Sequence, residues 1–161
     1  MSSFTTTAGK IFSQEMLAQQ AEIWRAQGRI IAMTNGCFDL LHAGHIFSLE
    51  TARSYGNVLV VAINCDDSVR RLKGPERPLN TQDDRARVLA ALACVDAVTI
   101  FEEDTSQKIL ELIRPDVFIK GGDYTAETIP ERDVVKAYGG RVVATPLLPG
   151  RSTTALISSC R

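Results

Sequence analysis

Short apolar runs rich in β-branched residues alternate with amphipathic segments along this chain. Five of the runs are predicted to be strands: Ile30–Thr34, Val58–Asn64, Ala97–Phe101, Val117–Lys120 and Val142–Thr145. Strands that are apolar on both faces and are separated by helices are typical of a parallel sheet that is covered on both sides. The pattern therefore predicts an α/β fold.

The segments between the runs have helical periodicity and helix-capping residues. Ser13 is expected to cap the first helix, which ends before Gly28. The predicted helices are Ser13–Gln27, His45–Ser54, Asp67–Leu72, Gln82–Cys94, Ser106–Ile113, Glu131–Tyr138 and one from Ser152. A length of 161 residues suits one Rossmann-like, doubly wound domain with about five parallel strands and helices on both faces. We expect residues 1–28 to be a helical extension and residues 29–161 to be the main domain.

Charge and composition exclude several classes of function. The 18 basic and 19 acidic residues give a net charge of −1, which argues against a nucleic-acid or membrane-surface binder. The chain lacks a membrane-spanning apolar run and a secretory leader, so a cytoplasmic location is expected. Its four widely spaced cysteines favour reduced thiols over a zinc ribbon. Arginine, which binds phosphate through a planar fork, makes up 13 of the 18 basic residues.

Gly, Asp, Ser and Thr gather directly after four of the predicted strands. These segments are Asn35–Asp39, Cys65–Asp67, Gly121–Tyr124 and Pro146–Thr154. Ligands of doubly wound folds bind outside the carboxyl ends of the strands, where the strand order reverses. With the usual order the first and fourth strands are neighbours, which places Asn35–His45 opposite Lys120–Tyr124.

His42 and His45, the only two histidines, stand three residues apart at a predicted helix start. Gly44 allows close approach of a ligand, and a helix N-terminus favours an anion. A bound phosphate would favour the charged imidazole, so we interpret the pair as part of a triphosphate site. Two alternatives are ordinary surface or capping histidines and a zinc pair. The zinc pair lacks the glutamate of H-E-x-x-H and has only Cys37 as a nearby soft ligand.

The run Thr34–His45 resembles the first motif of the cytidylyltransferase-like nucleotidyltransferases, with their H-x-G-H signature, and Gly150–Thr154 resembles their closing G-x-S-T-T motif. The details of Arg71–Gly74, Arg77–Pro78, Arg85–Val98 and Phe118–Tyr124 look most like the heptose 1-phosphate adenylyltransferases, which occur alone or fused to a sugar kinase. The resemblance covers about Ile30 to Ile157 and implies that residues 29–161 are a nucleotidyltransferase domain.

The resemblance implies transfer of AMP from ATP to D-glycero-D-manno-heptose 1-phosphate, giving ADP-heptose and pyrophosphate for the lipopolysaccharide inner core. Mg²⁺ would be carried by the ATP without a dedicated metal ligand, and a homodimer is expected. One alternative is a CTP-dependent enzyme acting on glycerol 3-phosphate or another phosphorylated alcohol. Leu147, which stands where enzymes of that type carry an arginine, weakens this alternative. Another is a nucleotide-binding module without turnover.

The resemblance also implies roles for individual residues. His42 and His45 would hold the ATP phosphates, and Lys73 and Arg77 the phosphates of either substrate. Backbone N–H groups of Gly36–Phe38 would contact the α-phosphate or the substrate. Asp66 would lie near the ribose, and Arg85 would lie beside the phosphate pocket. Asp123 and Tyr124 would lie near the sugar or the nucleotide, and Ser152 and Thr153 at the triphosphate. The remaining implied binding residues are Asn35, Asp39, Gly44, Lys120, Gly122, Gly150 and Thr154.

Six of these residues have a structural alternative. Asp39 either fixes its loop or touches substrate. Lys120 either reaches the phosphates or pairs with an internal carboxylate, because an unpaired buried charge is costly. Asp66 and Ser152 could cap the helices that follow them, and Lys73 and Arg77 could be solvated loop charges.

Overall fold

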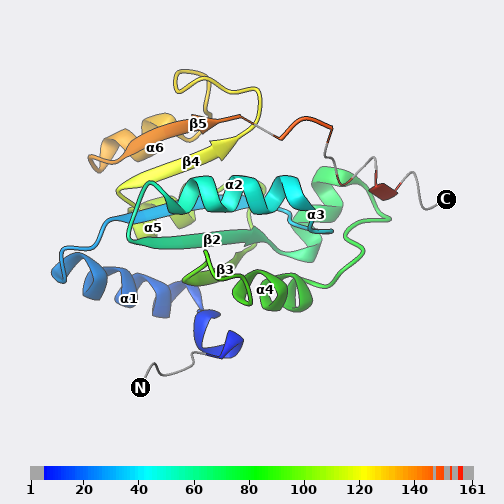
Figure 1. The fold of residues 1–161 in the computed structure, drawn as a ribbon, viewed down its shortest axis with the longest axis horizontal. Helices are drawn as coiled ribbons and strands as arrows, with labels where there is room; N and C mark the ends of the chain where they lie inside the picture. The colour runs from blue at the N-terminus through cyan, green and yellow to red at the C-terminus, as the bar shows by residue number, and fades with distance from the viewer. Residues whose placement is uncertain (1–5, 147, 151–152, 154–155, 158–161) are drawn as a thin grey trace.

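The computed structural model describes residues 6–146, 148–150, 153 and 156–157. Five parallel strands form one sheet in the order β3-β2-β1-β4-β5 (Figure 1). They are β1 (Ile31–Gly36), β2 (Val58–Asn64), β3 (Ala97–Phe101), β4 (Val117–Gly121) and β5 (Arg141–Thr145). The order reverses between β1 and β4. The predicted doubly wound α/β sheet and the neighbouring first and fourth strands are thus confirmed.

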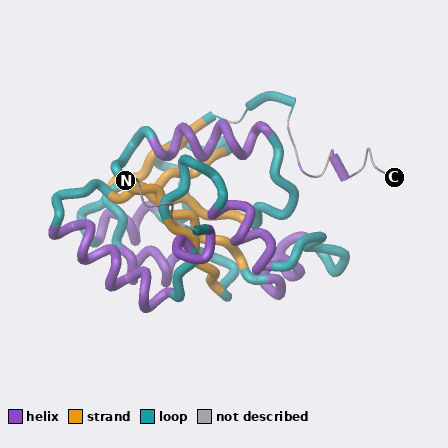
Figure 2. Tube along the Cα trace, turned by 60° about the horizontal axis from the view of Figure 1, so that its bottom comes forward, coloured by secondary structure: helices purple, strands orange, loops and turns teal. Residues whose placement is uncertain are grey.

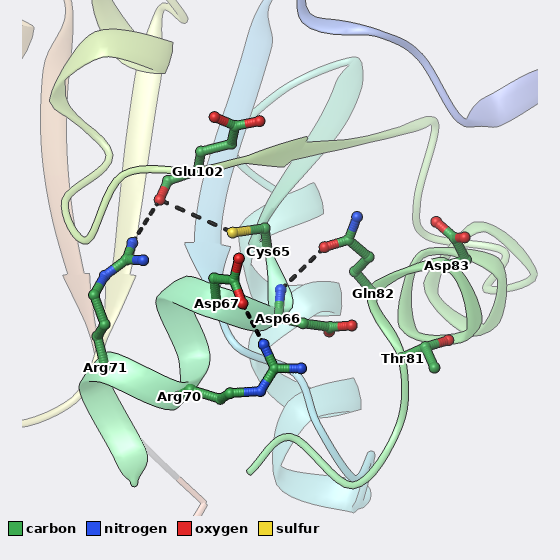
Figure 3. Close-up of a pocket in the computed structure, with 9 residues that line it drawn as sticks. All are labelled: Cys65, Asp66, Asp67, Arg70, Arg71, Thr81, Gln82, Asp83 and Glu102. Atoms are coloured by element: carbon green, nitrogen blue, oxygen red, sulfur yellow. Dashed lines mark hydrogen bonds and ion pairs between the residues drawn. The ribbon is translucent and has the colours of Figure 1, made fainter. Parts of the chain in front are cut away.

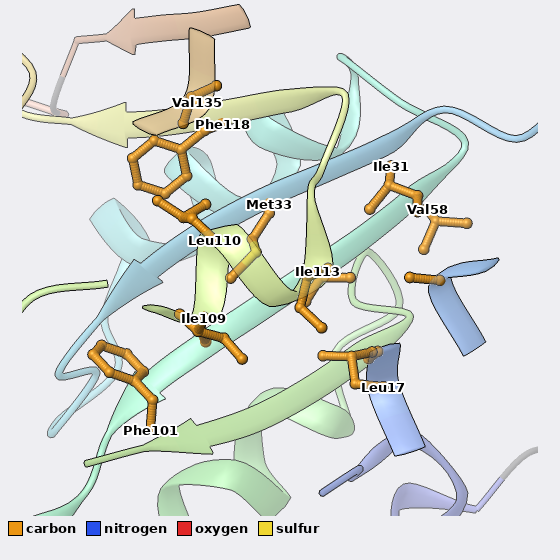
Figure 4. Packing of buried hydrophobic residues seen from close by; sticks show 14 of the residues in the cluster. Leu17, Ile31, Met33, Val58, Phe101, Ile109, Leu110, Ile113, Phe118 and Val135 are labelled. Atoms are coloured by element: carbon orange, nitrogen blue, oxygen red, sulfur yellow. The ribbon is translucent and has the colours of Figure 1, made fainter. Parts of the chain in front are cut away.

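Helices cover both faces of this sheet (Figure 2). They are α1 (Gln14–Ala26), α2 (Ala43–Arg53), α3 (Asp66–Lys73), α4 (Gln82–Ala90), α5 (Gln107–Ile113) and α6 (Arg132–Ala137), and a short 3-10 helix, η1 (Thr7–Lys10), precedes them. One apolar cluster packs Leu17 of α1, Ile109 of α5 and Val135 of α6 against the sheet (Figure 4). The other packs Leu49 of α2 and Leu89 of α4 against the opposite face. Alternate strand residues supply the two clusters.

The N-terminal segment belongs to this packing. Ser13 caps α1 as predicted, its hydroxyl accepting from the N–H of Met16 at 3.2 Å. Leu17, Ala21 and Trp24 of α1 are buried in the first cluster. Ahead of α1, Ile11 forms a parallel bridge with Val98 of β3. Residues before Gly28 therefore contribute to the core, and their behaviour as a separable extension remains a prediction.

Two helix boundaries differ from the prediction by more than one residue. Helix α2 begins at Ala43 rather than His45, because His42 is its N-cap. Helix α4 ends at Ala90 rather than Cys94. Beyond Ala90 the chain continues in turns, and the Lys10 ammonium donates to the carbonyls of Leu92 and Val95 at 3.3 and 2.8 Å. The helix predicted from Ser152 lies largely outside the described residues.

Candidate active site

A pocket of about 490 Å³ opens across the carboxyl ends of the strands, where doubly wound folds bind ligands. Its walls come from the loops after β1, β2, β3 and β4, from α2 and α3, and from the chain after β5. The lining residues are Asn35, Gly36, Cys37, Phe38, Asp39, His45, Asn64, Leu72, Lys73, Arg77, Asp104, Lys120, Tyr124 and Thr153.

His42 and His45 form a reciprocal cap at the start of α2. Nδ1 of His42 accepts from the N–H of Gly44 at 3.1 Å, and Nδ1 of His45 accepts from the N–H of His42 at 3.3 Å. The two rings are stacked with their centroids 3.9 Å apart. A ring whose Nδ1 accepts a hydrogen bond carries its proton on Nε2 when neutral. Each histidine therefore caps the helix with one nitrogen and retains an Nε2–H donor.

The structure gives His45 a low pKa. Burial, together with the neighbouring His42, lowers the pKa of His45 from its ordinary value of 6.5 to about 4. In this geometry His45 is a neutral donor at pH 7, and the charged form expected from the sequence refers to a bound phosphate. The sequence also predicted unpaired N–H groups at the helix start. Two of them have partners in the structure, since the N–H groups of His42 and Gly44 donate to the imidazoles of His45 and His42.

The loop from β1 to α2 packs against this cap. Phe38 has a left-handed backbone (φ 47°), and its ring centroid lies 5.4 Å from that of His45. A Cβ atom on Gly36 would lie 3.0 Å from the Phe38 ring. Glycine at position 36 thus lets the aromatic ring fold back beside the histidine at the floor of the pocket.

Asp39 anchors the loop that closes one side of the pocket. Its carboxylate is buried and accepts from the N–H groups of Leu79 and Asn80 and from Nε of Arg77. Burial alone would raise the pKa of Asp39, but these donors hold it below its ordinary value. The structure therefore assigns a loop-fixing role to Asp39, and both Asp39 and Arg77 still line the pocket.

Lys120 at the end of β4 makes the predicted contact with an internal carboxylate. Its ammonium lies 2.7 Å from Oε1 of Glu131 and 3.3 Å from Oδ1 of Asn35. The carboxylate of Glu131 is buried, so this pair avoids an uncompensated interior charge. Lys120 also borders the pocket, so the same ammonium neutralises Glu131 and adds positive charge to the pocket wall.

Arg85 and Asp66 lie behind the pocket rather than in its lining. The buried guanidinium of Arg85 donates to the carbonyls of Cys37, Asn64 and Asn80 and, at 2.9 Å, to Asp66. Helix α3 is capped by Cys65, and Asp66 is its first residue, so the alternative that Asp66 caps this helix is excluded.

Asp66 instead borders a second hollow, of about 730 Å³, between the starts of α3 and α4 (Figure 3). Charged groups there are largely paired within the chain. Arg70 contacts Asp67, and Nη2 of Arg71 lies 2.8 Å from the carbonyl oxygen of Glu102. Arg70 and Arg71 thus border this second hollow and are absent from the lining of the first pocket.

A comparison with known protein families identifies the family of this chain. The profile of the cytidylyltransferase-like family matches residues 33–160. The chain belongs to the cytidylyltransferase-like family. Membership makes it a nucleotidyltransferase and confirms the resemblance of its two terminal motifs to that family.

Individual relatives of this cytidylyltransferase-like chain are known. It is 50% identical over 148 residues to the bifunctional protein HldE of Syntrophotalea carbinolica and 52% identical over 148 residues to that of Geobacter metallireducens. Each match covers 92% of this chain and 30% of the relative, so the chain spans about a third of these relatives' length. A crystal structure of a lipopolysaccharide core biosynthesis protein from Thermoplasma volcanium superposes with a TM-score of 0.61 at 27% identity. That match covers 75% of this chain and 98% of the other.

The cytidylyltransferase-like pocket brings together most, but not all, of the residues predicted for it. Tyr124 lines it, and Thr153 donates to the carbonyl of Leu40 at 3.2 Å, which places the closing motif beside the first one. Gly122 (φ 138°) packs against the Tyr124 ring. Ser152 and Thr154 lie outside the described residues. The predicted residues that lie outside the lining are His42, Gly44, Asp66, Arg85, Gly122, Asp123 and Gly150.

Three lining residues were missed by the sequence reasoning: Asn64, Leu72 and Asp104. Asn64 is the single polar residue of an otherwise apolar strand and ends it, which is a readable signal. Asp104 follows β3, the one strand whose carboxyl end the sequence interpretation did not consider.

In the part of the chain that the structure describes, no group of three His, Cys, Asp or Glu side chains could hold a metal ion. None of the helices within that part is long and apolar enough to cross a bilayer.

Proposed function

We propose that this nucleotidyltransferase transfers the adenylyl group of ATP to a heptose 1-phosphate, D-glycero-D-manno-heptose 1-phosphate, releasing pyrophosphate. The observation that carries the proposal is the pocket at the β1/β4 reversal, where the neutral donor His45 lies with the cations Lys73, Arg77 and Lys120. Similarity to bifunctional HldE proteins and to a lipopolysaccharide core biosynthesis protein supports this choice of acceptor.

The reaction requires little proton chemistry from the protein. A phosphate oxygen of the sugar phosphate forms a bond to the α-phosphorus, and the bond from that phosphorus to the bridging oxygen of the leaving pyrophosphate breaks. The attacking oxygen is already ionised at neutral pH, so a general base is unnecessary. Alignment of the two phosphates and stabilisation of charge on the leaving group remain as the protein's tasks.

The pocket supplies groups for both tasks. The Nε2–H of His45 is fixed by the cap at Nδ1 and would donate to an oxygen of the triphosphate. Lys73 and Arg77, at the end of α3 and in the following loop, would hold the phosphate of the acceptor or the leaving group. Lys120, held by Glu131, would add positive charge from the β4 side. Mg²⁺ would enter with ATP and neutralise phosphate charge, as proposed from the sequence.

Pyrophosphate release measured across ATP, CTP, GTP and UTP, each with several phosphorylated acceptors, tests the proposal. We expect rapid release for ATP with heptose 1-phosphate. Release restricted to CTP with glycerol 3-phosphate would favour the cytidylyltransferase alternative. A lack of release with every pair, while nucleotide still binds, would favour a binding module. The homodimer and the cytoplasmic location remain predictions, and analytical ultracentrifugation tests the first.

A further inference from the structure

We propose that Asp104 and Asn64 form the subsite for the hydroxyl groups of the sugar phosphate, with Asp104 selecting the acceptor. This inference rests on the proposed function and extends it, because it assigns one end of the pocket to the polyhydroxyl part of the acceptor.

The topology gives the pocket two distinct ends. Asp104 follows β3 and Asn64 ends β2, whereas Lys120 and Tyr124 lie at the end of β4. In the order β3-β2-β1-β4-β5 these pairs stand on opposite sides of β1. Nucleotides bind doubly wound folds at the reversal of strand order, which here is between β1 and β4. The β2/β3 end is therefore left for the second substrate.

The β2/β3 end offers hydrogen-bond acceptors. Oδ1 of Asp104 accepts from Nε of Arg71 at 2.8 Å and from the Ser68 hydroxyl at 3.2 Å. Both of these hydrogen bonds, like the ion pair with Arg71, end on Oδ1 and not on Oδ2 of Asp104. The hydrogen bond from Arg71 also holds the pKa of Asp104 below its ordinary value, so the group is a carboxylate at neutral pH. A carboxylate only accepts hydrogen bonds and therefore requires a donor from the ligand.

Asn64 adds a second acceptor from a rigid position. Its side chain is buried, and Nδ2 donates to the Ser68 hydroxyl at 3.0 Å and to the carbonyl of Glu103 at 3.3 Å. These two bonds fix the amide, and its oxygen lies 3.9 Å from Sγ of Cys37, another residue of the lining. Asn64 thus presents an oxygen at the same end of the pocket as Asp104.

The chemistry of these two acceptors identifies the ligand class. A phosphate dianion has no donor to offer and is repelled by the Asp104 carboxylate, whereas a sugar offers several hydroxyl donors. Lys73 and Arg77, which line the same pocket, supply the complementary site for the phosphate of the same molecule. A pocket with acceptors at one end and two cations in its lining matches a sugar phosphate.

Hydrogen bonds from α3 fix the loop that carries Asp104. Arg71 reaches from this helix to the carbonyl of Glu102 (Figure 3). It also forms an ion pair with Asp104. A fixed carboxylate loses little conformational freedom on binding, which is the property expected of a specificity residue.

The substitution Asp104→Asn tests the subsite, with pyrophosphate release measured while one substrate is varied at a time. We expect KM for heptose 1-phosphate to rise about 10- to 100-fold, as for loss of a hydrogen bond to a charged group, and KM for ATP to change less than about twofold. Arg71→Gln breaks the same ion pair but keeps the carboxylate, so it should raise the acceptor KM several-fold less than Asp104→Asn does, the remaining rise reflecting the loosened loop. Asp67→Asn, in the exposed pair with Arg70, is the matched charge control.

Monodeoxy analogues of heptose 1-phosphate supply a readout that a merely structural role would not change. For the hydroxyl bound by Asp104, the loss of kcat/KM caused by the deoxy analogue in the wild type should largely disappear in the Asp104→Asn variant. Equal losses in both proteins for every analogue, with the wild type active, would overturn the subsite alone. A wild type inactive with all sugar 1-phosphates would overturn the proposed function and the subsite together.

Discussion

Nη2 of Arg85 lies 2.8 Å from the carbonyl oxygen of Asn64, at the end of β2. Through its other nitrogens the same buried guanidinium contacts the carbonyls of Cys37 and Asn80. The guanidinium of Arg85, on α4, thereby holds together three chain segments beside the pocket. Its fourth acceptor is the Asp66 carboxylate, so all four acceptors belong to the protein and Arg85 contributes to the shape of the site.

We expect Arg85→Met to lower the free energy of unfolding by about 3 kcal/mol or more, since it leaves buried carbonyls without a donor. Urea unfolding followed by circular dichroism measures this loss. Arg87→Met, on the exposed side of the same helix, should change the free energy by less than about 0.5 kcal/mol. Equal stability of the two variants would contradict the assigned role of Arg85.

Substitutions of His45 should separate helix capping from catalysis. Asparagine places its side-chain oxygen close to the position of Nδ1 and lacks the Nε2–H donor. His45→Asn should therefore reduce kcat about 100-fold or more with little change in stability, as for loss of one transition-state donor. His45→Ala should show a similar loss of activity and an additional loss of about 1 kcal/mol in stability, because the cap is removed. Near-normal turnover of either variant would exclude the proposed role.

The low pKa of His45 predicts a stability that depends on pH in a defined window. In the unfolded chain the imidazole binds a proton near pH 6.5, and in the folded protein only near pH 4. Between these values the unfolded state binds more protons, so the free energy of unfolding should increase as the pH rises from about 4 to about 6.5. The difference between wild type and His45→Asn across this range isolates the contribution of His45. A difference that is constant with pH would show that the group titrates normally.

Replacing Asp39 should loosen the loop beside the pocket. Asp39→Ala removes the acceptor for two backbone N–H groups and the partner of Arg77. We expect a loss of about 2–3 kcal/mol in stability, as for unsatisfied buried donors, and a higher KM for the substrate whose phosphate contacts Arg77. Asp67→Ala, which breaks an exposed ion pair, should cost less than about 1 kcal/mol. Thermal unfolding and steady-state kinetics of the two variants provide the comparison.

The packing of α1 predicts that residues 29–161 do not fold alone. Deletion of residues 2–28 removes Leu17, Ala21 and Trp24 from the first apolar cluster and exposes the sheet face beneath them. We expect the truncated chain to aggregate or to unfold without a cooperative transition. A monodisperse truncated protein with a sharp thermal transition would instead support the separable extension predicted from the sequence.

The sequence predicted the fold more completely than the contacts within the site. The strand runs and their order follow from local apolar patterns and from the general topology of βα units, so β2 and β3 were predicted to the residue. The direction of a charged side chain depends on tertiary packing. Arg85 was expected beside the phosphate pocket, yet it points inward because α4 packs its buried face against β2 and β3, where the guanidinium reaches the carbonyls of Cys37 and Asn64.

The same limit explains the residues that were missed or misjudged. Asp104 follows two other acidic residues, Glu102 and Glu103, and only the fold shows which of the three enters the pocket. The neutral state of His45 depends on burial and on the stacked His42, neither of which can be read from a free-imidazole pKa. The motif predicts His45 as a site residue, whereas its protonation depends on the fold.

The bridge between Ile11 and Val98 affects how readily the β3 edge of the sheet can pair with a strand from another molecule. A bare sheet edge recruits strands from other molecules through its unpaired peptide groups. On the β3 side two of the edge carbonyls are engaged within the chain, since the N–H of Phe12 donates to the Val98 carbonyl and the Gln14 amide to that of Ile100. Addition of a further strand at the β3 edge would have to displace these contacts.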